Sequence, residues 1–171
     1  TGAEYRMSGQ ITIPARFNGP PGSGNGGYSC GVLASQFDGA ARVRLHVPPP
    51  LDETMDLRRQ ADGSVAMYRD DVLVGTGVPE TLELDIPDPP SLPAAEAAEA
   101  RFICYDGTTF PTCFVCGPGR PAHDGLELYP GPVGDWQLLA CTWTPGDDLL
   151  DGGSGDDTLN DFATQQKLDH Q

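Results

Sequence analysis

Asn25, Gly26 and Gly27 are the first residues in the chain whose types and spacing suit chemistry on a ligand. They end a glycine-dense loop and precede an uncharged, largely apolar stretch. If that stretch is a helix, its first N–H groups lack partners and carry partial positive charge, so they can hold a carbonyl oxygen or a developing oxyanion. The alternative is structural: Asn25 only caps the helix, and the glycines only permit close packing.

A second cluster of candidate ligands lies further along the chain and consists of Cys104, Cys113, Cys116 and His123. The Cys-x-x-Cys spacing and the glycine after it are typical of two thiolates that bind one tetrahedral Zn²⁺. The other cysteine and the histidine would complete a Cys₃His site, so a structural zinc is one interpretation. A zinc ribbon has a second Cys-x-x-Cys, which this chain lacks. Buried structural cysteines and a redox-sensitive pair therefore stay open as alternatives.

Charge and composition exclude some function classes. Ten Lys and Arg residues against 25 Asp and Glu give a net charge of −15, which argues against nucleic-acid binding because that depends on neutralising phosphates. The five cysteines are an odd number at modest density, and the first seven residues do not resemble a secretion signal. We therefore expect a cytoplasmic protein. No apolar run approaches the ~20 residues of a membrane span.

The stretch from Phe17 to Phe37 contains no charged residue, although 20% of the chain is charged. Tyr28 and Val32 are four residues apart, which is one turn of a helix. A surface helix carries a charged face, so an uncharged one is expected to be buried. The pattern predicts a helix over residues 26–37 that is buried on nearly all sides.

Short segments with alternating apolar residues flank the predicted helix. One precedes it, and the others follow, at residues 5–13, 42–47, 51–59, 65–68, 72–78 and 82–86. Asp62-Gly63 predicts a tight turn between two of them. One strand, one buried helix and a series of antiparallel strands define an α+β fold in which the sheet curls round the helix.

The order of these patterns predicts four regions. Residues 1–87 form the core, and residues 88–100 form a Pro/Ala/Glu linker whose end has the composition of a helical turn. Residues 101–145 are rich in cysteine, glycine and proline, with one strand predicted at 136–144. Residues 146–171 form an acidic Gly/Asp-rich tail with few apolar residues, and we predict that it is disordered.

Two strings in the sequence resemble a known family. The string GNGGYSCGVLA, residues 24–34, resembles the start of the buried helix in hotdog-fold acyl-CoA thioesterases. The longer string FNGPPGSGNGGYSCGVLA, together with FPTCFVCGPGR, resembles an actinobacterial thioesterase-like group of hotdog proteins, over roughly residues 10–144. Two departures matter: Asn25 stands where many of these enzymes have His, and the last 25 residues do not look like an apolar second hotdog half.

The resemblance implies a hotdog fold, a homodimer or higher homo-oligomer, and a protein that binds and hydrolyses a small-molecule acyl thioester on coenzyme A or an acyl carrier. It implies that Gly26 and Gly27 N–H groups hold the carbonyl, that Asn25 positions water or substrate, and that Tyr28 lines the acyl pocket. Hydrolysis needs no cofactor. Nothing in the sequence singles out the general base among the nearest acids, which are Asp38, Asp52, Glu53 and Asp56.

A non-catalytic hotdog module for binding or assembly, with the cysteine-rich segment as a structural clamp, is the alternative. An acid within reach of a water near Gly27 would distinguish the enzyme from this module. A dehydratase would need a His–Asp or His–Glu pair, and no His lies near the predicted helix start in the sequence. The dehydratase therefore ranks last.

Overall fold

The computed structural model describes residues 6–85, 88–134 and 138–143, which divide into two compact units. The sheet unit comprises Thr1–Pro89 and Thr112–Phe114, and the C-terminal unit comprises Pro90–Pro111 and Val115–Gln171. The boundary falls close to residue 87, where the sequence predicts the end of the core. The sequence did not predict that Thr112–Phe114 belong to the sheet unit, because it assigns these residues to the cysteine-rich segment.

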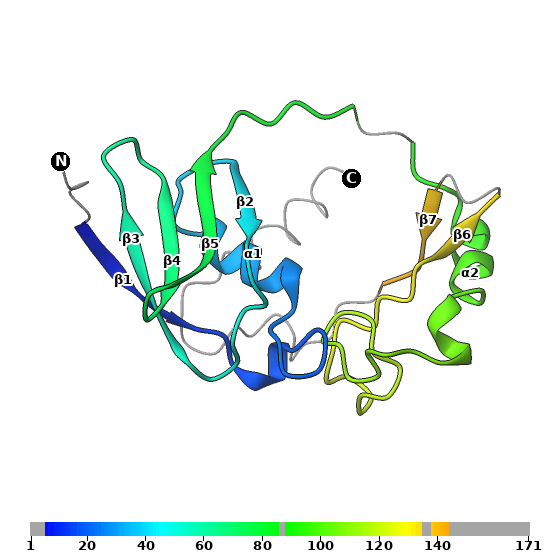
Figure 1. Ribbon diagram of the computed structural model, residues 1–171. Helices are drawn as coiled ribbons and strands as arrows, with labels where there is room; N and C mark the ends of the chain where they lie inside the picture. The colour runs from blue at the N-terminus through cyan, green and yellow to red at the C-terminus, as the bar shows by residue number, and fades with distance from the viewer. Residues whose placement is uncertain (1–5, 86–87, 135–137, 144–171) are drawn as a thin grey trace. The chain divides into compact units, whose positions relative to one another are not determined.

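The sheet unit is built on five antiparallel strands in the order β1-β3-β4-β5-β2 (Figure 1). Their bounds are β1 Arg6–Thr12, β2 Ala41–Leu45, β3 Thr54–Arg59, β4 Val65–Arg69 and β5 Val72–Pro79. One helix, α1 (Gly26–Ala34), follows β1 in the chain and packs against β2 and β5. A short 3₁₀ helix, η1 (Ala15–Phe17), lies between β1 and α1. This arrangement confirms the α+β class, with a helix packed on an antiparallel sheet.

The predicted turn at Asp62-Gly63 fixes the register of β3 and β4. Gly63 has a φ of 85°, which glycine adopts without strain. The N–H of Gln60 donates to the carbonyl of Ser64 at 2.8 Å and closes the turn. In the resulting register Leu57 faces Met67 across the two strands, and both side chains are buried.

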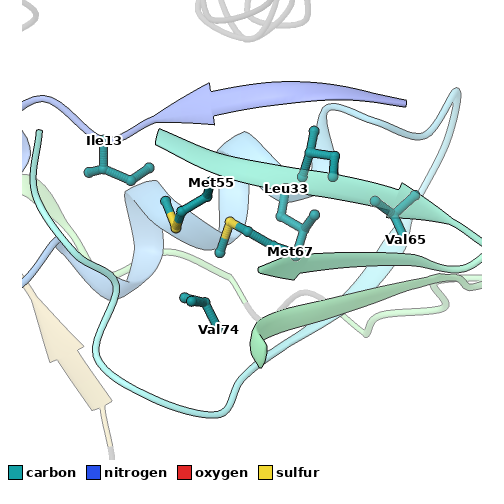
Figure 2. Close-up of a cluster of buried hydrophobic side chains, with 7 residues drawn as sticks. Ile13, Leu33, Met55, Val65, Met67 and Val74 are labelled. Carbon is teal, nitrogen blue, oxygen red and sulfur yellow. The ribbon is translucent and has the colours of Figure 1, made fainter. Parts of the chain in front are cut away.

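The core of the sheet unit is one cluster of large apolar side chains (Figure 2). Its members are at most 1% exposed, and they are Ile13, Leu33, Met55, Leu57, Val65, Met67 and Val74. Leu33 comes from α1, and most of the others come from the strands. Burying a side chain of this size contributes roughly 1.5–3 kcal/mol, so this cluster is the main source of stability in the sheet unit.

The helix is shorter than residues 26–37. It ends at Ala34, and the Ser35 hydroxyl donates to the carbonyl of Val32 at 2.8 Å. The next two N–H groups, of Gln36 and Phe37, donate three residues back rather than four. A tight turn therefore replaces the last predicted helical turn.

The prediction that α1 is buried on nearly all sides is wrong for the single chain. Only Ser29 and Leu33 are buried, whereas Gly26, Gly27 and Gly31 are exposed. The missing charges correctly indicated that α1 packs on the core, but one face is sufficient for that packing. The opposite face of the helix is uncharged and accessible.

The C-terminal unit contains α2 (Leu92–Glu99), the 3₁₀ helix η2 (Ile103–Asp106), and a two-stranded sheet of β6 (Gly131–Val133) and β7 (Leu138–Ala140). Helix α2 occupies most of the predicted linker, 88–100. Its proline is at the start of the helix, where proline is tolerated, and the residues after it are alanine and glutamate, which favour helix. The strand predicted at 136–144 forms only over Leu138–Ala140 among the described residues.

Two other predictions about the later chain can be compared with the structure. Residues 82–85 are not a strand, and Leu82 and Leu84 are 63% and 67% exposed. The ladder between β5 and β2 ends where the N–H of Glu80 donates to the carbonyl of Ala40, so the alternation beyond it meets no partner strand. The tail at 146–171 lies outside the described residues. Within the described part of the chain, no helix has the length and apolar character to cross a membrane.

Candidate functional site

The loop that precedes α1 holds the start of the helix in place through backbone hydrogen bonds. Asn18 and Gly24 form an isolated antiparallel bridge. The N–H of Gly24 donates to the carbonyl of Pro49 at 2.8 Å, and the N–H of Asn25 donates to the carbonyl of Phe17 at 2.7 Å. These bonds fix the position of Asn25, Gly26, Gly27 and Tyr28, which are called the helix-start site below.

Asn25 caps α1, as the structural reading of the sequence predicts. Its Oδ1 accepts a hydrogen bond from the N–H of Tyr28 at 3.0 Å, and the residue is 9% exposed. Its Nδ2 donates to Sγ of Cys113 at 3.6 Å. Both polar atoms of the Asn25 side chain are therefore engaged in holding the helix start.

Gly26 and Gly27 are the first two residues of α1, and both are exposed. At these positions the backbone N–H groups have no acceptor within the helix. They lie at the positive end of the helix dipole, where an oxygen with negative charge is stabilised. The start of α1 is thus exposed at the two glycines whose N–H groups have no acceptor within the helix.

Tyr28 contributes an aromatic surface next to these donors. Its ring stacks on Phe17 with centroids 3.9 Å apart and planes 8° from parallel. The ring of Phe114 meets both in edge-on contacts, at 4.8 Å from Phe17 and 6.2 Å from Tyr28. Burial raises the pKa of the Tyr28 phenol, so the hydroxyl is neutral at physiological pH. This apolar group adjoins the N-terminal end of α1.

Cys113 is a residue of this site that the sequence analysis did not place beside Asn25; its Cys-x-x-Cys spacing left zinc binding and a buried structural role as alternatives. It is 7% exposed and lies against Asn25. Its neighbours anchor it: the N–H of Phe114 donates to the carbonyl of Asn18 at 2.7 Å, and Asn18 Nδ2 donates to Thr112 Oγ1 at 3.1 Å. No sequence signal used above indicates this proximity; the two family strings, FNGPPGSGNGG and FPTCFVCG, were matched only for their resemblance to a family.

The four candidate bases have other positions. Asp52 accepts a hydrogen bond from the N–H of Ala15 at 2.8 Å, and Glu53 pairs with Arg69 at 3.4 Å. Asp56 accepts from Gln10 at 2.9 Å on the neighbouring strand. Asp38 is exposed and follows the C-terminal end of α1. None of these contacts involves the helix-start site.

Ser29 is the one buried polar side chain of α1 whose oxygen lacks a hydrogen-bond partner among the described residues. It is fully buried, and a methyl group added at Gly24 would lie 3.0 Å from its Oγ. The hydroxyl is packed rather than bonded. It therefore supports the close approach of the loop to the helix and offers nothing to a ligand at the exposed glycines.

The zinc interpretation stays a prediction. Among residues 6–85, 88–134 and 138–143, no group of three or more His, Cys, Asp or Glu side chains is placed to hold a metal ion. In the C-terminal unit the N–H of His123 donates to Glu127 Oε1 at 2.6 Å, and Cys104 and Cys116 are half-buried. Elemental analysis of protein purified without chelators tests it: about one zinc per chain supports the site, and none removes it.

The remaining cysteines, Cys30 and Cys141, are half-buried. Burial raises the pKa of the Cys30 thiol in α1. Burial also raises the pKa of the Cys141 thiol, which follows β7. Both thiols are protonated at neutral pH and are poor nucleophiles.

Comparison with known proteins adds no assignment to this geometry. No protein-family model, curated protein or solved structure matches the chain. The resemblance of the two strings to hotdog thioesterases therefore has to be judged on the residues and on the fold. The structure supplies an antiparallel sheet, a helix packed on it, and exposed glycine donors at the start of that helix.

Proposed function

We propose that the sheet unit is a hotdog-type domain that binds an acyl thioester and hydrolyses it at the N-terminal end of α1. The observation that carries this proposal is the pair of exposed glycine N–H groups at the start of a helix packed on an antiparallel sheet. Thioester hydrolysis passes through a tetrahedral oxyanion, and positioned N–H donors are the most effective way to stabilise it.

In this reaction the thioester carbonyl oxygen accepts hydrogen bonds from Gly26 and Gly27. The Tyr28 ring and its aromatic neighbours support the acyl chain. Water adds to the carbonyl carbon, the carbon–sulfur bond breaks, and the thiolate leaves with the proton that the water gave up. Asn25 cannot take that proton, so its role is to hold the helix start and orient the ligand. No cofactor takes part.

The chain associates with a second copy in this proposal. One face of α1 is uncharged and accessible, and β1 and β2 are the outer strands of the sheet. Open strand edges and apolar helix faces are commonly covered by symmetric pairing. If none of the chain's own carboxylates reaches the site, a carboxylate of the second copy acts as the general base that activates the water. Sedimentation as a strict monomer at tens of micromolar would argue against this association.

A second candidate function is thioester binding without hydrolysis, in a module for assembly or transport. The observation that favours it is the engagement of Asp52, Glu53 and Asp56 with partners outside the helix-start site. The two functions share the ligand and differ in the fate of the carbon–sulfur bond. The same experiment therefore separates them.

The experiment replaces Gly26 by proline, which removes its N–H. Proline suits the first position of a helix, and the preceding Asn25 already has the extended conformation, φ −61° and ψ 130°, that a residue before proline prefers. Gly26→Ala is the matched control, because it keeps the N–H and places its methyl group 3.9 Å from Leu45, an ordinary contact.

We expect Gly26→Pro to lower kcat/KM for acyl-CoA by about 100-fold, the loss typical of one oxyanion donor. Gly26→Ala should change it less than about threefold, with equal thermal unfolding of both variants by circular dichroism. Equal activity of both variants would exclude Gly26 N–H as the donor. A wild-type protein that binds a non-hydrolysable acyl-CoA thioether but releases no thiol from the thioester would establish the binding module instead.

A further inference from the structure

The side chain of Asn25 lies between a backbone donor and a thiol. Its Oδ1 accepts from the N–H of Tyr28 at 3.0 Å, and its Nδ2 donates to Sγ of Cys113 at 3.6 Å. Both Asn25 and Cys113 are buried, so water competes little for these bonds. An amide side chain has an acceptor on one side and donors on the other. Asn25 therefore satisfies both neighbours in one orientation of its amide, with the oxygen toward the helix.

The position of Cys113 is fixed by bonds that do not involve Asn25. The N–H of Phe114 donates to the carbonyl of Asn18 at 2.7 Å, and Asn18 Nδ2 donates to Thr112 Oγ1 at 3.1 Å. The ring of Phe114 also packs edge-on against Phe17. The residues on both sides of Cys113 are thus tied to the loop before α1, and the sulfur is an acceptor that is already in place when Asn25 meets it.

The orientation of the Asn25 amide decides whether the first turn of α1 is closed. The carbonyl of Asn25 accepts the N–H of Ser29 at 2.9 Å, and a methyl group added at Gly27 would lie 3.4 Å from Asn25 Oδ1. The amide therefore lies directly against the first turn. If it rotated by half a turn, Nδ2 would face the N–H of Tyr28, and two donors would meet. A buried donor without an acceptor is costly, so loss of the Cys113 sulfur favours such rotations.

We propose that Cys113 is a positioning residue of the helix-start site. Its sulfur holds the Asn25 amide in the orientation that caps α1, and this keeps the N–H groups of Gly26 and Gly27 in place for a ligand. Cys113 acts through Asn25 and requires only an acceptor at position 113, not a nucleophile. The kinetic consequence rests on the proposed function, whereas the positioning itself can be measured without a substrate.

The test uses the full-length protein and three variants. Cys113→Ala removes the acceptor, and Cys113→Ser keeps one because a hydroxyl oxygen also accepts hydrogen bonds. Cys30→Ala is the matched control, since it removes a half-buried thiol from α1 itself. Circular dichroism checks that each variant is folded. Should Cys113→Ala unfold, Cys113→Val takes its place, because valine fills the site without an acceptor.

The first readout is hydrogen exchange of the Tyr28 amide, followed by NMR without any ligand. This N–H is the one that Asn25 Oδ1 binds. We expect about tenfold faster exchange in Cys113→Ala, the change that corresponds to one neutral hydrogen bond. Cys113→Ser and Cys30→Ala should stay within about threefold of wild type, and the amides of β3 and β4 should be unchanged in all variants.

The second readout is a double-mutant cycle on the hydrolysis of an acyl-CoA thioester. Cys113→Ala and Asn25→Ala should each lower kcat/KM by about tenfold, again the equivalent of one hydrogen bond. The loss should fall mainly on kcat, because the glycine donors bind the oxyanion more strongly than the ground-state carbonyl. Because Cys113 acts through Asn25, the double variant should lose no more than Asn25→Ala alone.

The failures are distinguishable. Losses that multiply to about 100-fold in the double variant would overturn the proposal, because the two residues would then act independently. Cys113→Ser with the inactivity of Cys113→Ala but wild-type exchange at Tyr28 would also overturn it and indicate chemistry at the thiol. If no protein, wild type included, hydrolyses the thioester, the proposed hydrolysis fails and the exchange of Tyr28 alone decides. Faster exchange in Cys113→Ala that Cys113→Ser restores would still support the positioning role, and equal exchange in all variants would overturn it.

Discussion

The sheet unit and the C-terminal unit are each stabilised by a different kind of interaction. The sheet unit has seven large apolar side chains, each at most 1% exposed, in one cluster. In the C-terminal unit the buried apolar residues among those described are small or few: Ala95, Ala98 and Phe102. Hydrophobic burial scales with apolar area removed from water, so the sheet unit has far more of this stabilisation than the C-terminal unit.

The C-terminal unit relies instead on polar and aromatic contacts. Glu99 at the end of α2 accepts hydrogen bonds from both the N–H and the hydroxyl of Thr142. The rings of Phe102, Tyr105 and Tyr129 lie 5.3–5.5 Å apart in pairs. A small unit held in this way tolerates little change at any one contact. The proposed site accordingly lies on the sheet unit, whose core can hold a glycine-rich helix start rigidly.

The largest expected effect is that of a charge in the sheet-unit core. Leu33→Asp places an unpaired carboxylate in a fully buried position, which costs several kcal/mol and should unfold the sheet unit. Leu33→Met keeps the volume and should cost less than about 1.5 kcal/mol. Urea unfolding followed by circular dichroism measures both. A stable Leu33→Asp protein would show that α1 is not central to the fold.

The next effect concerns the C-terminal unit. A methyl group added at Gly131 in β6 would overlap the carbonyl oxygen of Ala98 in α2, so Gly131→Ala should separate the two elements and cost at least the ~1–3 kcal/mol of overpacking. Hydrogen exchange should show lost protection in α2 and unchanged protection in β3 and β4. The control Gly31→Ala adds its methyl group in open space on α1. Equal loss of protection in the sheet would contradict the independence of the two units.

Asn25 should show a moderate effect that separates its two hydrogen bonds. Asn25→Ala removes the helix cap and should cost about 1 kcal/mol. Asn25→Asp keeps an acceptor for the N–H of Tyr28 and adds negative charge at the helix start, but loses the donor to Cys113. We expect its thermal stability to lie near that of wild type. If Asn25→Asp loses as much thermal stability as Asn25→Ala, the hydrogen bond from Asn25 to Cys113 contributes more to stability than the helix cap does.

The smallest expected effect is a pH dependence at the β3–β4 turn. The hydroxyl of Ser64, and next its N–H, donate to Asp62 and lower the pKa of that carboxyl. A carboxyl whose folded pKa is lowered stabilises the fold above its unfolded pKa of about 3.9, and this contribution is lost as pH falls through the folded value. Wild-type protein should therefore exceed Asp62→Asn in stability at pH 7, with the difference vanishing in acid. A difference independent of pH in urea unfolding would exclude this cause.

The sequence predicted the sheet unit well because its signals are local. Alternation located five strands, and Asp62-Gly63 located the turn between β3 and β4. The last predicted turn of α1 does not form, because the Ser35 hydroxyl donates a hydrogen bond back to the carbonyl of Val32. The spacing of apolar residues gives no information about this bond. Leu82 and Leu84 occupy alternate positions, as apolar residues do in a strand, but both are exposed. Such alternation does not show whether a partner strand exists.

The candidate site was predicted in part. Asn25 as a cap was one of the two interpretations of the sequence, and its hydrogen bond from the N–H of Tyr28 agrees with it. The exposure of Gly26 and Gly27 was not predicted, because the missing charges indicated a helix buried on nearly all sides. The contact between Asn25 and Cys113 joins residues 88 positions apart, and a two-residue spacing near Cys113 pointed to a metal instead. Such long-range contacts depend on the three-dimensional fold, which no local pattern encodes.

The central claim is that the start of α1 holds the thioester carbonyl. Backbone amide chemical shifts, followed during titration of the full-length protein with a non-hydrolysable acyl-CoA thioether that keeps the carbonyl, test it most directly. We expect saturable shifts that are largest at the N–H groups of Gly26 and Gly27, and Gly26→Pro should weaken binding while Gly26→Ala does not. Saturable binding that leaves both glycine signals unmoved, or no binding at all, would contradict the account.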